Sequence, residues 1–153
     1  AYIHDFHLGL RGGADSAPVL ARSETIETAL SQVLDGKAEN DAFNQLITLA
    51  ALEPRAVVWL RAWFRYLRQT GLAYGIPTVV AALGNHASIA RSIIDMFVAL
   101  HDPAHTGDRA KDAAKLDASI NEGLAKVSAI DEDRILRLFR SVVKATLRTN
   151  AFA

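Results

Sequence analysis

PRAVVWLRAWFRYLRQTG, residues 54–71, is the stretch that decides the fold of this 153-residue chain. Pro54 suits the first turn of a helix, where its missing N–H would have no partner, and Gly71 suits the position just past a helix end. Between them the residues are apolar nearly all round, which is typical of a helix at the buried centre of a domain. The side chains expected to be buried are Trp59, Trp63 and Leu67.

Three arginines interrupt this apolar helix: Arg61, Arg65 and Arg68. Buried arginines must be paired, so we expect them at the edge of the domain or bonded to carboxylates and helix ends. A substrate-anion site is the less favoured interpretation.

Helical patterns continue on the N-terminal side of this stretch. Ser23 is expected to cap the helix ETIETALSQVL at its start, and Gly36 to end it. Asn40 or Asp41 is expected to cap a second helix, AFNQLITLAAL.

On the C-terminal side, four more helices are expected, at about residues 77–84, 87–100, 108–128 and 131–150. Only an antiparallel hairpin can join the last two, because the link around Ala129 and Ile130 is so short. The predicted fold class is therefore all-α: a helical bundle of six or seven helices that ends in a long helical hairpin. One orphan N-terminal β-strand is also predicted, because residues 1–10, AYIHDFHLGL, alternate in character.

The charge balance limits the partners. Lysine plus arginine and aspartate plus glutamate number 17 each, so nothing in the net charge favours a nucleic acid or an anionic membrane. The absence of cysteine rules out disulfides and thiol chemistry and fits a cytoplasmic location. The apolar runs are too short for a membrane span or a signal peptide, so we expect no membrane contact.

No nucleotide or metal site is predicted. The glycines of LGLRGGADS match neither the dinucleotide fingerprint nor the Walker pattern. His4 and His7 would point to opposite faces of a strand. His101 and His105 have the spacing of a helical metal pair, but Pro103 breaks the helix between them, so we expect surface or capping histidines.

The final helix carries the candidate functional residues. It opens with Asp131, Glu132 and Asp133, which we interpret as structural, because negative charge is favourable at a helix start and Asp131 can cap the helix. A basic stripe about 120° wide follows, opposite the apolar face. Its members are Arg134, Arg137, Arg140, Lys144 and Arg148. The stripe is either a solvated helix face or a docking face for an acidic surface of a larger protein. Duplex nucleic acid is a weaker third interpretation, because aromatic interleaving and net basic charge are missing.

Four stretches resemble the large bacterial NAD-specific glutamate dehydrogenases, in the same order along the chain. They are AENDAFNQLI, RAWFRYLRQTGL, IARSIIDMFVALHDP and DEDRILRLFRSVVKATLRTN. Together they cover roughly residues 38–150, and the last resembles the family's sequence immediately before its catalytic domain. Residues 72–86 match weakly, and Ala151 stands where the family pattern suggests an aromatic residue.

The resemblance implies a parent enzyme that oxidatively deaminates L-glutamate to 2-oxoglutarate and ammonia with NAD. The family's substrate lysines, glycine-rich substrate motif and dinucleotide fold belong to its later catalytic domain and have no match here. We therefore predict no catalytic, cofactor-binding or metal residue in this chain, with NAD bound elsewhere in the parent.

The resemblance also implies a division of the chain. Residues 1–12 would be a strand and linker left from an upstream regulatory domain, and residues 13–153 a helical connecting domain. Its partners would be the regulatory and catalytic domains of the same chain, in a parent that forms a homo-oligomer. The start at Ala1 instead of methionine also suggests a segment of a longer protein. An independent helical module that binds an acidic partner or nucleic acid through the basic stripe is the alternative.

Overall fold

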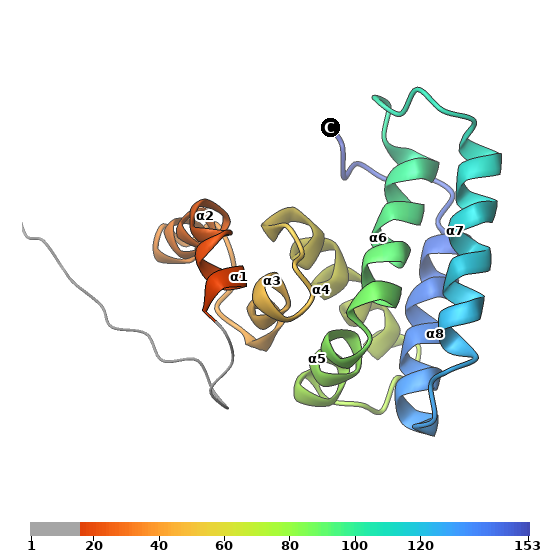
Figure 1. Cartoon of the computed structure of the whole chain (residues 1–153), viewed down its shortest axis with the longest axis horizontal. Coiled ribbons are helices and arrows are strands. Elements are labelled where there is room, and N and C mark those ends of the chain that lie inside the picture. The colour runs from red at the N-terminus through yellow and green to blue at the C-terminus, as the bar shows by residue number, and fades with distance from the viewer. Residues whose placement is uncertain (1–15) are drawn as a thin grey trace, which may run out of the picture.

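A computed structural model describes residues 16–153, and this part of the chain is helical (Figure 1). The elements are α1 (Ala17–Leu20), α2 (Ser23–Leu34), the 3₁₀ helix η2 (Ala42–Gln45), α3 (Leu46–Leu49), α4 (Pro54–Gln69), α5 (Ile76–Asn85), α6 (Ala87–His101), α7 (Arg109–Leu124) and α8 (Ile130–Ala145). The all-α prediction is confirmed for these residues. The predicted strand and the glycines of residues 12 and 13 lie outside them.

The helix predicted after Asp41 is in fact two short elements, η2 and α3. The Asp41 carboxylate accepts a hydrogen bond from the Phe43 amide, and the Asn44 side chain donates to the Glu39 carbonyl. Such side chain to backbone bonds compete with regular helix formation, which explains the tight 3₁₀ turn. This break and the short α1 raise the helix count above the six or seven expected.

Two of the predicted caps are wrong. Ser23 is the first residue of α2, with Arg22 at the cap position and no side-chain cap. Asp131 lies inside the first turn of α8, with Ala129 at the cap position. In α8 the Asp131 carboxylate is bonded elsewhere: it accepts a hydrogen bond from the hydroxyl of Tyr74.

The central helix α4 follows the prediction closely. Pro54 begins it, and Gly71, with a positive φ of 98°, follows its C-terminal residues. Trp63 and Leu67 are buried. Trp59 is only partly buried, because it lies at the edge of the core, where its ring packs against Phe152 near the end of the chain.

The core lies where α4 and α5 meet the three long helices α6, α7 and α8 (Figure 1). Its largest fully buried side chains are Phe43, Phe97, Phe139, Leu46, Leu60, Leu83, Ile93, Met96, Ile120, Ile135 and Leu136. α7 packs most closely against α6. Gly123 permits this approach, because a Cβ atom there would lie 2.8 Å from Ile89 Cγ1.

Across residues 16–153, every helix is too short or too polar to cross a membrane.

Candidate functional site

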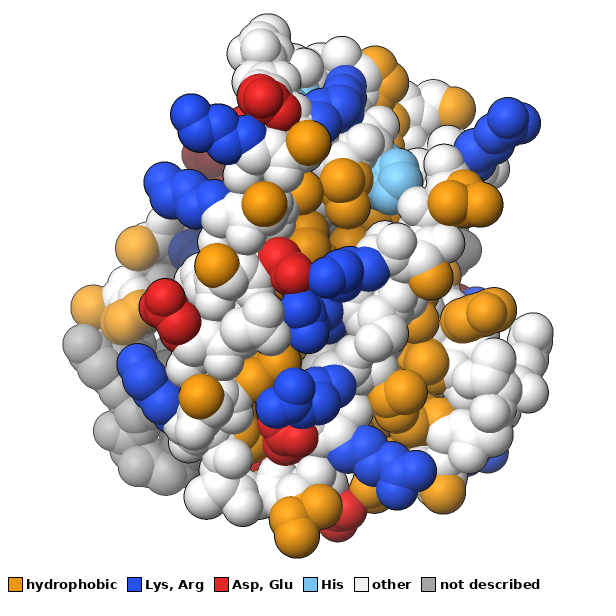
Figure 2. Space-filling model, turned by 90° about the vertical axis from the view of Figure 1, so that its right-hand side faces the viewer, with side chains coloured by type: hydrophobic (Ala, Val, Ile, Leu, Met, Phe, Trp, Pro, Cys, Tyr) orange, Lys and Arg blue, Asp and Glu red, His pale blue; other side chains and the backbone are white. Residues whose placement is uncertain are grey.

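The basic stripe of α8 lies on the face of the molecule that α7 and α8 share, where Lys and Arg side chains gather (Figure 2). The structure divides its five members by what they contact. Arg140 donates from Nε to Asp117 Oδ1 at 2.6 Å and from Nη2 to Asp117 Oδ2 at 2.9 Å. Lys144 donates to the same carboxylate at 2.7 Å. Two members of the stripe therefore hold α8 to α7.

Asp117 is the acceptor that the sequence-based interpretation missed. The hydrogen bond from Arg140, together with that from Lys144 and the two positive charges, lowers the pKa of this carboxyl to about 2, against the opposing effect of burial. Arg140 and Asp117 are both mostly shielded from solvent, with side chains 18% and 21% exposed. Their spacing of 23 residues gives no local signal; only the antiparallel arrangement of α7 and α8 brings them together.

The other three members of the stripe are exposed. Arg137 pairs with Asp133 one turn earlier on α8, a contact of the surface (i, i+4) kind. Arg134 and Arg148 have no ion pair among the described residues, and Arg137 is bound only to a residue of its own helix.

The predicted helix 131–150 is shorter in the structure. α8 ends at Ala145 and the chain turns to an extended conformation at Thr146, so Arg148 lies beyond the helix that was expected to carry it.

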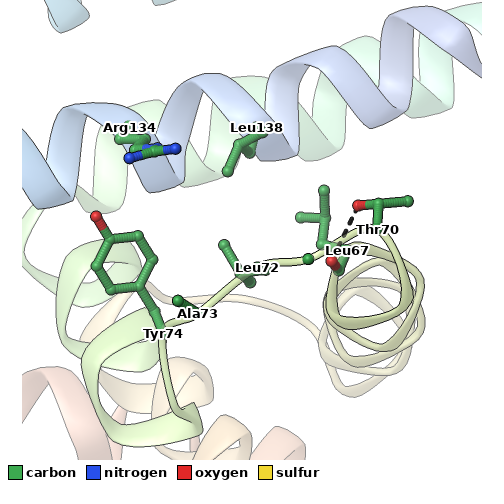
Figure 3. A pocket seen from close by; sticks show the side chains of 8 residues that line it. Leu67, Thr70, Leu72, Ala73, Tyr74, Arg134 and Leu138 are labelled. Atoms are coloured by element: carbon green, nitrogen blue, oxygen red, sulfur yellow. Dashed lines mark hydrogen bonds between the residues drawn. The ribbon is translucent and has the colours of Figure 1, made fainter.

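A small hollow of about 240 Å³ adjoins Arg134 (Figure 3). Its walls are the end of α4, the following loop and α8, with Leu67, Leu72 and Leu138 forming its apolar side. The Tyr74 hydroxyl at its rim points toward α8 and donates to Asp131 at 2.6 Å, which raises the pKa of that phenol. The hollow offers one guanidinium and apolar side chains, and its tyrosine hydroxyl is already bonded to a carboxylate.

The acidic start of α8 is structural, as predicted. Glu132 accepts hydrogen bonds from Asn85 and from the ring of His86, at 2.8 Å each, and these contacts lower its pKa. With the Tyr74–Asp131 bond, they attach the first turn of α8 to α5 and to the loop before it.

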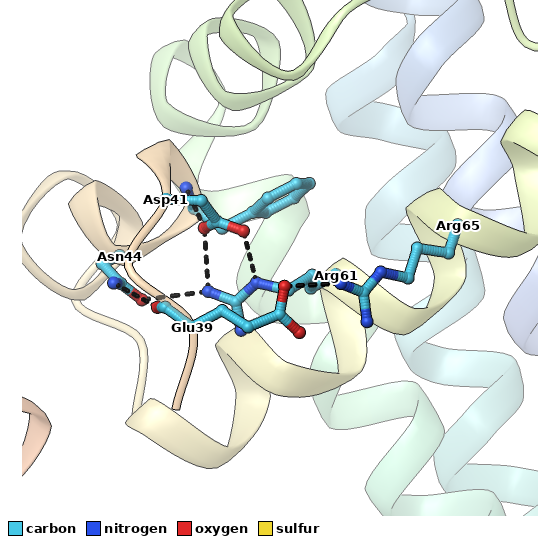
Figure 4. A network of polar contacts seen from close by, with 6 residues as sticks. Glu39, Asp41, Asn44, Arg61 and Arg65 are labelled. Atoms are coloured by element: carbon cyan, nitrogen blue, oxygen red, sulfur yellow. Dashed lines mark hydrogen bonds and ion pairs between the residues drawn. The ribbon is translucent and has the colours of Figure 1, made fainter. Parts of the chain in front are cut away.

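The arginines of α4 satisfy the expectation that they would be paired (Figure 4). Arg61 is buried and donates to both carboxylate oxygens of Asp41, at 2.6 and 2.9 Å. Arg65 pairs with Glu39, and Arg68 donates to the carbonyl of Leu72 just past the helix end. The contacts of Arg61 and Arg65 hold the turn before η2 against α4, and that of Arg68 holds the loop after α4. The structure therefore gives no support to a substrate-anion site here.

The histidines at positions 101 and 105 also contact side chains within the fold. His105 pairs with Asp112 at the start of α7. His101 packs against Phe97. Its pKa is lowered mainly by burial and, to a smaller extent, by the nearby positive charge of Arg109. Residues 16–153 contain no group of three or more His, Asp or Glu side chains placed to hold a metal ion.

Comparison with known proteins gives this arrangement a family context. Residues 38–103 match the family model described as "Glutamate dehydrogenase, helical motif 3". The predicted resemblance is confirmed. Helical motif 3 thus begins just before η2 and ends just after α6, so it includes the Arg61–Asp41 pair and excludes the basic stripe.

Similarity to proteins named NAD-specific glutamate dehydrogenase extends over 99% of the chain. The chain is 37% identical to the protein of Pseudomonas aeruginosa, 35% to that of Mycobacterium tuberculosis and 34% to that of Halomonas elongata. It spans only 9%, 10% and 9% of their respective lengths. No solved structure matches the chain.

Proposed function

We propose that this chain is a non-catalytic helical segment of a large NAD-dependent glutamate dehydrogenase. One observation carries the proposal: almost the whole chain is similar to proteins of that name, yet it covers about a tenth of each. The parent enzyme would oxidatively deaminate L-glutamate to 2-oxoglutarate and ammonia with NAD, and the segment would link its regulatory and catalytic domains.

The contacts of the ionisable groups support a connecting role. Asp41, Asp117 and Glu132 each bind a side chain of another element, and each of these bonds joins two elements of the fold. Acid–base catalysis needs a group that is placed to exchange a proton with a substrate, whereas these carboxylates accept hydrogen bonds from within the chain. By holding these elements together, the three carboxylates would keep the segment rigid between the domains it connects.

The proposal includes a contact between α8 and a neighbouring domain of the parent enzyme. Arg134 and Arg137 of α8, with Arg148 in the segment that follows it, would supply the contacts, because Arg140 and Lys144 are already bound to Asp117. Surface ion pairs contribute only about 0–1 kcal/mol each. Several such pairs across one interface would nevertheless fix the orientation of the two domains.

Two measurements test the proposal. The full-length parent protein should reduce NAD in the presence of L-glutamate, followed as absorbance of the reduced cofactor. The isolated 153-residue chain should show no heat of NAD binding in calorimetry at micromolar concentrations. Saturable NAD binding by the isolated chain would contradict the non-catalytic assignment, and a full-length protein that does not oxidise glutamate would contradict the parent activity.

A further inference from the structure

The carboxylates of α7 and α8 are almost all used inside the fold. Residues 109–148 hold nine Lys and Arg against six Asp and Glu. The acidic side chains bonded within the described chain are Asp112, Asp117, Asp131, Glu132 and Asp133. Among residues 109–148, Glu122 is the one carboxylate for which the structure shows no partner.

Three lysines have no such partner: two lie in α7, and the third, Lys126, follows the last residue of that helix, Leu124. Lys111, Lys115 and Lys126 are exposed and form no ion pair with the described residues. The spacing of Lys111 and Lys115 places them on the outer side of α7, because the buried side chains of that helix, Ile120 among them, point the other way. The excess positive charge is therefore directed at solvent.

The helix that carries Lys111 and Lys115 lies directly beside α8, where Arg134 and Arg137 are exposed. The bonds from Arg140 and Lys144 to Asp117 show that the two helices are direct neighbours. Figure 2 shows the result, a broad face over both helices on which Lys and Arg outnumber Asp and Glu. A sequence of zero net charge thus presents one locally basic face.

We propose that the outer side of α7 belongs to the same docking surface as α8, and that its partner is an acidic surface elsewhere in the same polypeptide. This inference rests on the proposed function. Charge complementarity requires a partner rich in Asp and Glu, since the exposed lysines outnumber the one carboxylate of α7 that the structure leaves unbonded, Glu122. The chain covers about a tenth of its relatives, so most of such a polypeptide lies outside it and can supply that surface.

The test uses the full-length protein and a zero-length carbodiimide cross-linker, which joins a lysine amine to a carboxylate in direct contact. Peptide mass spectrometry should find Lys111, Lys115 or Lys126 joined to Asp or Glu beyond residues 1–153. Lys37 is the matched control, because it is also exposed and already pairs with Asp35; it should be joined within the segment. Cross-links from Lys111, Lys115 and Lys126 that stay within the segment would overturn the proposal.

A charge-reversal variant gives a second readout. Lys111→Glu with Lys115→Glu should abolish the long-range cross-links of Lys126 and lower the salt concentration at which limited proteolysis begins to separate the domains. The fold should persist, because Lys111 lies in the first turn of α7, where negative charge is favourable. Unchanged cross-links and proteolysis in this variant would overturn the proposal.

Two further outcomes identify a different partner. In a mixture of isotope-labelled and unlabelled protein, cross-links that join labelled to unlabelled chains would overturn the same-polypeptide assignment in favour of a second copy. Duplex DNA retained at physiological salt and released by the double substitution would overturn it in favour of nucleic acid. Glutamate oxidation by the wild-type protein is measured separately, so a failure of the proposed function is distinguishable from a failure of this inference.

Discussion

Replacing Asp117 by asparagine should destabilise the 153-residue chain through one identifiable contact. Its carboxylate accepts three hydrogen bonds, two from Arg140 and one from Lys144, and asparagine keeps the shape but removes the charge. The pKa is lowered from 3.8 to about 2. At roughly 1.4 kcal/mol per pKa unit, this shift corresponds to about 2 kcal/mol of folding free energy at pH 7.

The direction of the pKa shift determines how the stabilisation by Asp117 changes with pH. The pKa is lower in the folded state, so the stabilisation is fully present above the unfolded value and is lost as pH falls through about 2. The difference between wild type and Asp117→Asn in urea unfolding, followed by circular dichroism, should therefore be about 2 kcal/mol at pH 7 and about 1 kcal/mol at pH 3.

Asp133→Asn is the matched control for this experiment. Asp133 pairs with Arg137 on the same helix, and the side chain of that arginine is 51% exposed. An exposed (i, i+4) pair contributes only about 0.3–0.5 kcal/mol. A loss at Asp117 no larger than that at Asp133, or one that does not diminish below pH 4, would refute the argument that the carboxylate clamps α7 to α8.

Three other substitutions test the core and the end of the chain. Trp63→Ala should cost about 3–5 kcal/mol in urea unfolding, because the side chain is buried against Phe97; an unchanged midpoint would show that α4 is not central. Arg61→Met should cost about 3 kcal/mol, because it leaves the Asp41 carboxylate without its guanidinium, and a neutral result would make the pair dispensable. Phe152→Ala should lower the melting temperature measurably by removing the ring stacked on Phe97, whereas truncating the 90% exposed Leu147 should not.

The sequence predicted the long helices and their starts well, because each has a strong periodic pattern. The ends of the last two were wrong: α7 ends at Leu124 instead of about residue 128, and α8 ends at Ala145 instead of residue 150. Pro54 and Gly71 bound α4 as expected, and Gly36, with a positive φ of 68°, follows α2. The prediction failed around Asp41, where side chain to backbone hydrogen bonds replaced a regular helix with a 3₁₀ turn. Whether such a bond forms depends on which side chain reaches which backbone amide, and the spacing of apolar residues does not predict this.

The aromatic cluster at the end of the chain could not be predicted in the same way. Phe152 follows α8 in sequence but packs on Phe97 of α6 and Trp59 of α4. The guanidinium of Arg55 lies over both the Trp59 and Phe152 rings and also donates to the Ala151 carbonyl. The Arg55–Ala151 bond joins residues 96 positions apart, and the ring contacts are also distant in sequence, so no local pattern marks them.

The basic stripe shows what tertiary structure adds to a helical pattern. Periodicity alone placed five cations on one face of the predicted helix 131–150 and treated them as equivalent, although α8 ends at Ala145, before Arg148. The structure separates them by partner, because Arg140 and Lys144 bind Asp117 of α7 and the other three make no contact with that carboxylate. Reversing Arg140 would therefore remove an internal clamp as well as a surface charge, and lost docking could not be distinguished from lost folding. Arg137, whose partner lies within its own helix, is the position at which a charge change tests docking itself.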